Sequence, residues 1–456
     1  MDTLIYWVIR VGIVAAAVLL LMVMVKILRR IWEKRKWYKL SGLKLTIRRK
    51  KVQGIVFGKW GKFRRYVYSP TFREGSIGVF GGSGSGKTAG LLIPTLRAWT
   101  GAALVFDISG DIAKNVSNPL KVIFSPENAN TAPYNPFAII DILPDTNEQR
   151  ERLMQLAFLL LPDSPQDGDV TMFYKSEARK LLQAGMIAYY FAGLDFCQVC
   201  QHMVKCDVDL LIEDIQASGN ELAEILVSGF EGQNEKTLAG IKQTADDSIM
   251  LFATNEKIAR TVRRAESGPA LWPGTLERRS MYIVIDDVKL EFYAPLLRLI
   301  TAQCLEYLSM RPNGASPNML LCLDEFASLG KLEIIPTLRK LRKKNVRLMV
   351  LTQSLADLEL IYGREERRAM MENLPYKAVL AAFDTETQKY FSDLAGEIET
   401  VRRTFTDNQD GGSESRTTQR EKRIYPEEFA KLGDKLVLFY PAGVHKLRKA
   451  FYFKWW

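Results

Sequence analysis

The sequence predicts an α/β protein in which helices flank a parallel sheet. Three observations carry this prediction. A short apolar strand at 77–80 enters a glycine-rich loop, and a helical pattern follows at Ala89–Ala98. Buried-strand patterns then alternate with helical patterns, as expected for a parallel, helix-covered sheet. Between about 147 and 266 the spacing of apolar residues is helical with almost no strand signal, which predicts an all-helical insert.

The glycine-rich loop matches the Walker A pattern Gly-x-x-x-x-Gly-Lys-Thr. Its residues are Gly81, Gly82, Ser83, Gly84, Ser85, Gly86, Lys87 and Thr88. The glycines let the backbone curl so that its N–H groups converge on a phosphate. The lysine reaches the β- and γ-phosphates, and the threonine hydroxyl binds Mg²⁺ at the start of a helix. We therefore expect a nucleoside triphosphate, ATP, with Mg²⁺.

The elements follow in chain order. Residues 40–76 read as a β-hairpin, because short apolar pieces alternate with basic and glycine-containing turns. The expected strands are 102–107, 121–124, 281–285, 319–323, 346–351 and 378–382, with a final hairpin at 435–453. The expected helices of the insert are 150–161, 173–191, 210–218, 222–230 and 235–252. The polar, Gly/Ser-rich stretch 404–421 is interpreted as a mobile loop.

The net charge of +11 is concentrated near the N-terminus. Residues 26–65 contain sixteen Lys or Arg and one acid, Glu33, so 47 basic and 51 acidic residues remain elsewhere, a balance of −4. The basic composition is therefore a local feature and is weak evidence for nucleic-acid binding by the rest of the chain.

An apolar run, Leu4–Ile27, lies directly before this basic stretch. It is long enough to cross a bilayer, which needs roughly 20 residues. The positive flank follows the run rather than preceding it, unlike in a signal peptide, and places the bulk of the chain in the cytoplasm. We expect a single-pass anchor within residues 1–30, its N-terminus outside. The basic flank is suited to anionic lipid head groups.

Three cysteines and a histidine, Cys197, Cys200, His202 and Cys206, resemble a metal site in composition. Their spacing matches no common zinc pattern, and the segment has helical periodicity. Cys197 and Cys200 occupy apolar positions beside Phe196 and Val199. We therefore interpret them as buried helix residues.

A second nucleotide-site pattern begins at the strand 319–323. Asp324 follows this buried strand and is expected to hold Mg²⁺, while Glu325 is the expected general base for the attacking water. Gln353 ends the next strand, where a neutral amide can sense the γ-phosphate. A run of cations precedes that strand, and one arginine from it is expected to reach a neighbouring subunit's phosphate.

Together these segments resemble the type IV secretion coupling proteins, the TraG/TraD-like ATPases of bacterial conjugation. The resemblance is carried by 324–330, 332–336 and 352–354, with further landmarks at 134–137 and 173–175. It implies a RecA-like nucleotide-binding domain in two parts, 31–146 and 269–456, interrupted by an all-α domain at 147–268. By position, the family's trans-acting arginine falls on Arg342, with Arg347 as the fallback, and its sensor glutamine on Gln353.

The resemblance also implies a homo-hexamer on the bacterial inner membrane. Its partners would be single-stranded DNA bound to a relaxase and the inner-membrane components of a type IV secretion channel. Family members usually have two membrane helices, whereas this sequence predicts one. Two alternatives remain: an ATPase that exports protein effectors only, and a docking scaffold in which ATP hydrolysis is incidental.

Overall fold

The computed structural model describes residues 22, 24 and 43–454, except 62, 74, 165–166, 267–269, 330, 333 and 409–410. The chain divides into two units, Met1–Lys44 and Leu45–Trp456, and the second contains the parallel sheet and its covering helices. The predicted anchor at 4–27 falls outside the described residues except at 22 and 24. Among described residues, no helix has the length and apolar character needed to cross a membrane.

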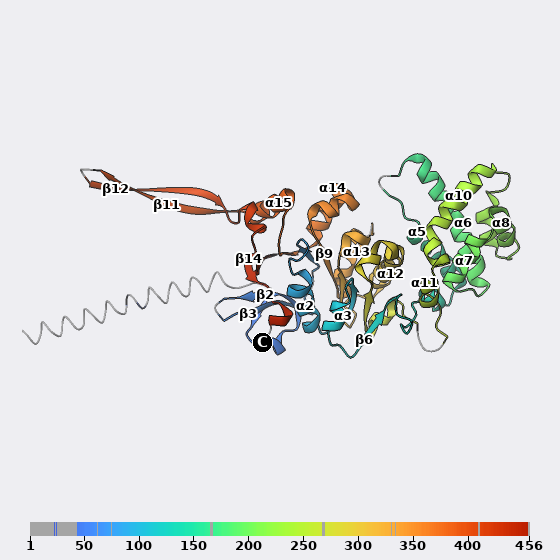
Figure 1. The fold of residues 1–456 in the computed structure, drawn as a ribbon, viewed down its shortest axis with the longest axis horizontal. Coiled ribbons are helices and arrows are strands. Elements are labelled where there is room, and N and C mark those ends of the chain that lie inside the picture. Colours follow the sequence, from blue (N-terminus) through green and yellow to red (C-terminus); the bar gives the residue numbers. More distant parts are fainter. Residues whose placement is uncertain are drawn as a thin grey trace, which may run out of the picture. The chain divides into compact units, whose positions relative to one another are not determined.

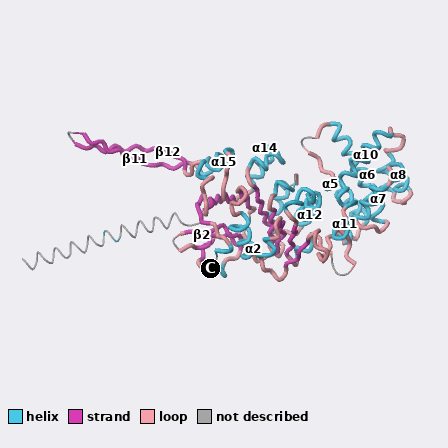
Figure 2. Tube along the Cα trace, in the orientation of Figure 1, coloured by secondary structure: helices cyan, strands magenta, loops and turns pink. Residues whose placement is uncertain are grey.

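Twelve strands form one mixed sheet in the order β1-β3-β2-β14-β13-β10-β4-β9-β8-β5-β7-β6 (Figures 1 and 2). From β10 to β6 all neighbours are parallel, whereas β13, β14, β2 and β3 join them antiparallel. Their bounds are β1 (Lys44–Thr46), β2 (Gly54–Trp60), β3 (Arg65–Pro70), β4 (Ile77–Phe80), β5 (Ala102–Asp107), β6 (Lys121–Phe124), β7 (Ser280–Val284), β8 (Met319–Leu323), β9 (Val346–Thr352), β10 (Tyr376–Val379), β13 (Lys435–Tyr440) and β14 (Gly443–Arg448).

The central strands are apolar runs because helices bury both of their faces. Every residue of β4, β5, β8 and β9 is buried. The predicted strands at 102–107, 121–124 and 319–323 are confirmed residue for residue. The strand predicted at 378–382 is found at Tyr376–Val379, so it begins two residues earlier, where Tyr376 pairs with Ile77 at the start of β4, and ends three residues earlier. The hairpin predicted within 40–76 is confirmed as β2 and β3.

The helices are α2 (Ile93–Ala98), α3 (Asp111–Asn115), α4 (Ala138–Asp141), α5 (Thr146–Leu160), α6 (Asp169–Phe191), α7 (Phe196–Lys205), α8 (Val208–Gln216), α9 (Glu221–Ser228), α10 (Glu235–Thr254), α11 (Glu256–Thr261), α12 (Leu290–Met310), α13 (Ile334–Leu341), α14 (Leu355–Asn373) and α15 (Thr385–Ala395). Several begin where a side chain accepts a backbone N–H of the first turn, as at Asp195, Asn234, Ser354 and Asp384. The long helices predicted in the insert are all present.

Helices α5 to α11 form one group in Figure 1, coloured green to yellow. Its core includes α7, where Cys197 and Cys200 are buried, as the apolar spacing predicts. The boundaries 146 and 268 remain a prediction, since these helices and the sheet fall within one compact unit.

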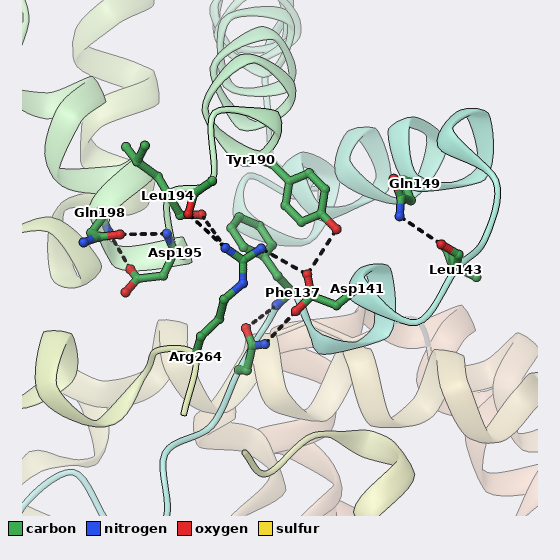
Figure 3. A network of polar contacts seen from close by, with 11 residues as sticks. Phe137, Asp141, Leu143, Gln149, Tyr190, Leu194, Asp195, Gln198 and Arg264 are labelled. Carbon is green, nitrogen blue, oxygen red and sulfur yellow. Dashed lines mark hydrogen bonds and ion pairs between the residues drawn. The ribbon is translucent and has the colours of Figure 1, made fainter. Parts of the chain in front are cut away.

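Two neighbouring chain segments join this helical group to the sheet. Tyr134 forms bridges with Val262 and Leu271, so the outgoing and returning segments run side by side. Arg264 secures this junction (Figure 3): its guanidinium donates to the carbonyls of Gly193 and Leu194, which follow α6, and to Asp141.

The prediction of a mobile loop at 404–421 is wrong. Residues Glu397–Asn408 (β11) and Gly411–Lys422 (β12) form a separate antiparallel two-stranded sheet, paired in register from Glu397 with Lys422 to Asn408 with Gly411. The segment has too few apolar residues to give a buried-strand pattern, so its sequence resembles that of a loop. The threonines and Val401 supply the strand preference instead.

Candidate nucleotide-binding site

The Walker A loop leaves the carboxyl end of β4, which lies between β10 and β9 inside the twelve-stranded sheet. Gly84 and Gly86 have φ values of +71° and +85°, a left-handed conformation that glycine adopts without steric penalty. After Lys87 the chain enters a π-helical turn, Thr88–Leu92, which continues into α2. The loop therefore presents backbone N–H groups at a helix start, an arrangement suited to phosphate.

Lys87 is almost fully buried, with 6% of its surface exposed. Its Nζ donates to the Gly81 carbonyl at 2.6 Å and lies 3.7 Å from Oε1 of Glu325. The ammonium is thus held inside the loop, beside the predicted general base.

Thr88 and Asp324, both predicted to hold the metal, come together from segments far apart in sequence. Thr88 Oγ1 lies 3.5 Å from Asp324 Oδ2. Asp324 follows the buried strand β8 and is itself 8% exposed. Burial, and then the charge of Glu325, raise the pKa of Asp324 to about 6, while Lys87 opposes the shift. A hydroxyl and a carboxylate are the oxygen ligands that Mg²⁺ prefers, so the pair fits this ion.

Glu325 adopts a left-handed backbone conformation, with a φ of +44°. This conformation is uncommon for a residue with a side chain and is found disproportionately at functional sites. Its side chain is partly exposed, and Gln353 Nε2 lies 3.5 Å from its Oε2. Gln353 directly follows β9, the strand between β4 and β8. The sheet order thus places the predicted base and the predicted sensor next to each other.

Ser85 supplies an independent sign of a ligand. Its hydroxyl oxygen is buried, and within the described part of the chain it has no hydrogen-bond partner. A buried hydroxyl without a partner is costly, and a phosphate oxygen could satisfy it. The residues of the loop therefore fit a bound phosphate group.

Three residues that sequence reasoning missed also contact the loop. Lys449, which follows β14, is buried and donates to the carbonyls of Ser85 and Gly433 at 2.7 and 2.6 Å. A Cβ on Gly86 would lie 2.9 Å from the ring of Phe451, and one on Gly82 would lie 2.9 Å from that of Phe383. No local motif marks these residues, because strand pairing brings them to the loop: Lys449 and Phe451 follow β14, and Phe383 follows β10, the parallel neighbour of β4.

Arg342 lies away from this group. It is exposed and lines a hollow with Ser76, Val346 and Tyr376, at the amino ends of β4, β9 and β10. The Walker A loop leaves β4 at its opposite end, so Arg342 does not reach the nucleotide site of its own chain. Its expected role toward a neighbouring subunit stays a prediction.

The fallback residue Arg347 is unsuited to such a role. It is 2% exposed, and its guanidinium donates to the Gly75 carbonyl at 2.8 Å and to Ser69 Oγ at 3.1 Å. Burial lowers its pKa to about 10. Arg347 therefore joins β9 to the β3–β4 connection and is unavailable to a partner.

Comparison with known proteins places these features in a family. A family model described as "Type IV secretory system Conjugative DNA transfer" matches residues 33–455. Conjugal transfer protein TraG of Rhizobium radiobacter is 25% identical over 407 residues, covering 84% of this chain and 62% of the relative. Protein VirD4 of Rhizobium rhizogenes is 25% identical over 428 residues, covering 88% and 62%. The chain thus spans about three-fifths of the length of these curated relatives.

The fold is also similar to solved structures. The unbound bacterial conjugative coupling protein TrwBdeltaN70 aligns with a TM-score of 0.69 at 19% identity, covering 88% of this chain and 89% of that one. Plasmid coupling protein TrwB in complex with ADP and Mg²⁺ aligns with a TM-score of 0.66 at 20% identity, covering 82% and 85%. The chain belongs to the type IV secretory system conjugative DNA transfer family.

Proposed function

We propose that this chain is a membrane-anchored ATPase that couples relaxase-bound DNA to a type IV secretion channel. ATP hydrolysis would drive the transfer. The observation that carries the proposal is the convergence of the Walker A loop with the acidic pair after β8, where Lys87 Nζ lies 3.7 Å from Glu325 and Thr88 lies 3.5 Å from Asp324. The match to the conjugative DNA transfer family and the similarity to conjugal transfer protein TraG support the DNA-transfer role, and the TrwB complex with ADP and Mg²⁺ supports the ligands.

Each residue of the site has a separate role in binding or hydrolysing ATP. Backbone N–H groups of the loop, with Lys87, bind and orient the phosphates. Thr88 and Asp324 would hold Mg²⁺, which when bound neutralises charge on the β- and γ-phosphates. Glu325 accepts the proton of the attacking water, and Gln353 beside it orients that water or responds to loss of the γ-phosphate. Lys449 and Phe451 keep the loop in its curled form.

The proposed activity involves neighbouring subunits and the membrane as well as the single chain. We infer a RecA-like domain that works as a homo-hexamer, with Arg342 completing the site of a neighbouring subunit. The predicted span at 4–27 would hold this ring on the bacterial inner membrane with the N-terminus outside, next to inner-membrane components of the channel. The exposure of Arg342 and its place at the sheet edge away from its own loop support a role in trans.

Two substitutions test the central claim. Lys87→Ala and Glu325→Gln should each lower ATP hydrolysis at least about 100-fold, because each removes a group that acts on the transferred phosphate or on water. DNA transfer between cells should fall with it. Lys114→Ala and Glu291→Gln, at exposed positions, are the matched controls. Transfer that survives loss of hydrolysis would favour the docking scaffold.

The substrate needs its own measurement. The full chain in neutral detergent should bind single-stranded DNA, and DNA should stimulate its ATPase. If ATPase is normal but neither binding nor stimulation occurs, the exporter of protein effectors is favoured. For the trans arginine, Arg342→Ala subunits mixed with Lys87→Ala subunits should regain part of the activity that each lacks alone; no recovery at any ratio would contradict the shared site.

A further inference from the structure

Two hollows at the ends of β2 are lined by cationic side chains. The first, of about 750 Å³, lies before the strand, and its cations are Arg48, Arg49, Lys50, Lys51 and Arg97. The second, of about 530 Å³, lies after it, and its cations are Lys59, Arg64, Lys435, Lys446 and Arg448. None of the described residues that line either hollow is an Asp or a Glu.

Like charges crowd together at both places. After burial, the charge of Arg97 lowers the pKa of Arg49, and the charge of Arg64 lowers that of Lys59. Residues 43–73 contain ten Lys or Arg and no acid, so the chain itself supplies no carboxylate from this stretch. At the rim of the second hollow Lys446 pairs with Glu428 at 2.8 Å. An anion bound in either hollow would relieve the remaining repulsion.

An exposed apolar residue precedes the cations at each end. Ile47, directly before Arg48, is 64% exposed, and Phe63, directly before Arg64, is 72% exposed. A cation beside an exposed apolar side chain suits a membrane surface, where the apolar group enters the head-group boundary and the cation meets lipid phosphate. The predicted span ends at Ile27, some twenty residues upstream of Arg48.

We propose that these two hollows bind the phosphates of anionic lipids, so that the hairpin of β2 and β3 rests on the membrane surface. The proposal rests on the membrane anchoring proposed above. It extends the anchor into the folded part of the chain, and it assigns a ligand to cations that the nucleotide site does not use.

The phosphates of nucleic acid are negatively charged like those of anionic lipids and could bind the same cations. Two observations favour lipid over nucleic acid as the ligand. The cations are concentrated in residues 26–65, next to the predicted span, while the rest of the chain carries −4. Ile47, the exposed residue before the first hollow, has no ring to stack on a base, whereas Trp60 and Phe63 at the second hollow have rings, so this observation favours lipid at the first hollow only.

Hydrogen exchange of the full chain in lipid nanodiscs tests the proposal. Discs of phosphatidylcholine alone are compared with discs containing an equal amount of phosphatidylglycerol. Amide exchange at residues 47–52 and 60–65 should be slower by about tenfold or more in the anionic discs, and added salt should reverse the effect. A single-stranded oligonucleotide added to the neutral discs is the second probe.

Two sets of variants separate the hollows. Arg48→Gln with Lys50→Gln and Lys51→Gln should abolish protection at 47–52 and leave 60–65 protected. Lys59→Gln with Arg64→Gln should do the reverse. Lys205→Gln with Lys236→Gln removes exposed cations elsewhere and should change neither segment. Unchanged exchange in the helices and retained ATPase activity would establish that each variant is folded.

The outcomes are distinct. Equal exchange in neutral and anionic discs would overturn the lipid site while leaving the ATPase intact. Protection by the oligonucleotide but not by anionic lipid would assign the hollows to nucleic acid. Failure of the chain to enter any disc would instead contradict the proposed anchor.

Discussion

At the scale of single residues, the site depends on ionisable groups held in a largely buried setting. Lys87 and Asp324 are each less than one-tenth exposed, and Glu325 lies beside both. Charged groups in such a setting interact more strongly than in water, but each also loses hydration. For Asp324 the loss of hydration outweighs the attraction to Lys87, so its pKa is raised to about 6.

This shift predicts how Asp324→Asn changes stability with pH. The folded pKa lies above the ordinary value of 3.8, so the aspartate destabilises the fold once it ionises. In the ligand-free chain with a chelator, the asparagine should raise the free energy of unfolding by about 2 to 3 kcal/mol at pH 7.5 and by little near pH 4. Denaturant unfolding at both pH values measures it. Exposed Asp287→Asn is the control, and an equal gain at both pH values would contradict the cause.

Lys449 yields a second residue-scale prediction. Lys449→Met keeps the length of the side chain but removes the donor to the Ser85 and Gly433 carbonyls. The loop should hold its curled conformation less firmly, and the Kd for ATP should rise about 5- to 30-fold, the equivalent of about one hydrogen bond to a charged group. Binding titrations measure the change, with exposed Lys431→Met as the matched control. An unchanged Kd with lowered stability would assign Lys449 a purely structural role.

At the scale of elements, β11 and β12 show how a polar ribbon can be mistaken for a loop. Their sheet shares no ladder with the larger one in the described chain. It is tied to the body at its base, where Lys422 pairs with Asp393 at 2.7 Å and the Arg423 N–H bonds the Gly396 carbonyl.

Removing the outer part of this ribbon should therefore leave the body folded. Deleting residues 400–419 and joining the ends with Asn-Gly retains both ties at the base. We expect the melting temperature to fall by less than about 3 °C, because little apolar surface is lost. Differential scanning calorimetry measures it, and basal ATP hydrolysis should persist. Cooperative loss of the whole fold would show that the ribbon is part of the core.

At the scale of the whole molecule, the junction at Arg264 connects the helical group to the sheet (Figure 3). Asp141 accepts from Arg264, Tyr190 and Asn135 at 3.0, 3.1 and 3.0 Å, so residues from both segments of the junction meet at one carboxylate. The Arg264 guanidinium also lies over the rings of Phe137 and Tyr190, at 5.8 and 5.5 Å.

Arg264→Met should loosen this connection. It leaves Asp141 with fewer donors and frees two carbonyls after α6, which should lower the free energy of unfolding by about 1 to 3 kcal/mol. Faster amide exchange should appear in residues 134–141 and 190–195 before other segments. The neighbouring Arg263→Met removes an ion pair with the highly exposed Glu266 and should cost less than about 0.5 kcal/mol. Equal effects of the two variants would contradict the role of the junction.

The sequence by itself determined the local parts of this protein. The Walker A loop, the acidic pair after β8, the buried strands and the long helices follow from short-range patterns, because glycine conformation, apolar periodicity and strand-end acids are local properties. The same reasoning failed for β11 and β12, whose polar sequence gives no apolar pattern.

Only the tertiary structure decided which of these parts meet. Strand order placed Gln353 beside Glu325, and the antiparallel return of β14 brought Lys449 and Phe451 onto the loop. It also removed Arg347 from the candidates, since its guanidinium is buried among backbone carbonyls. Such contacts join residues far apart in sequence, and their geometry is set by sheet pairing, which no local pattern records.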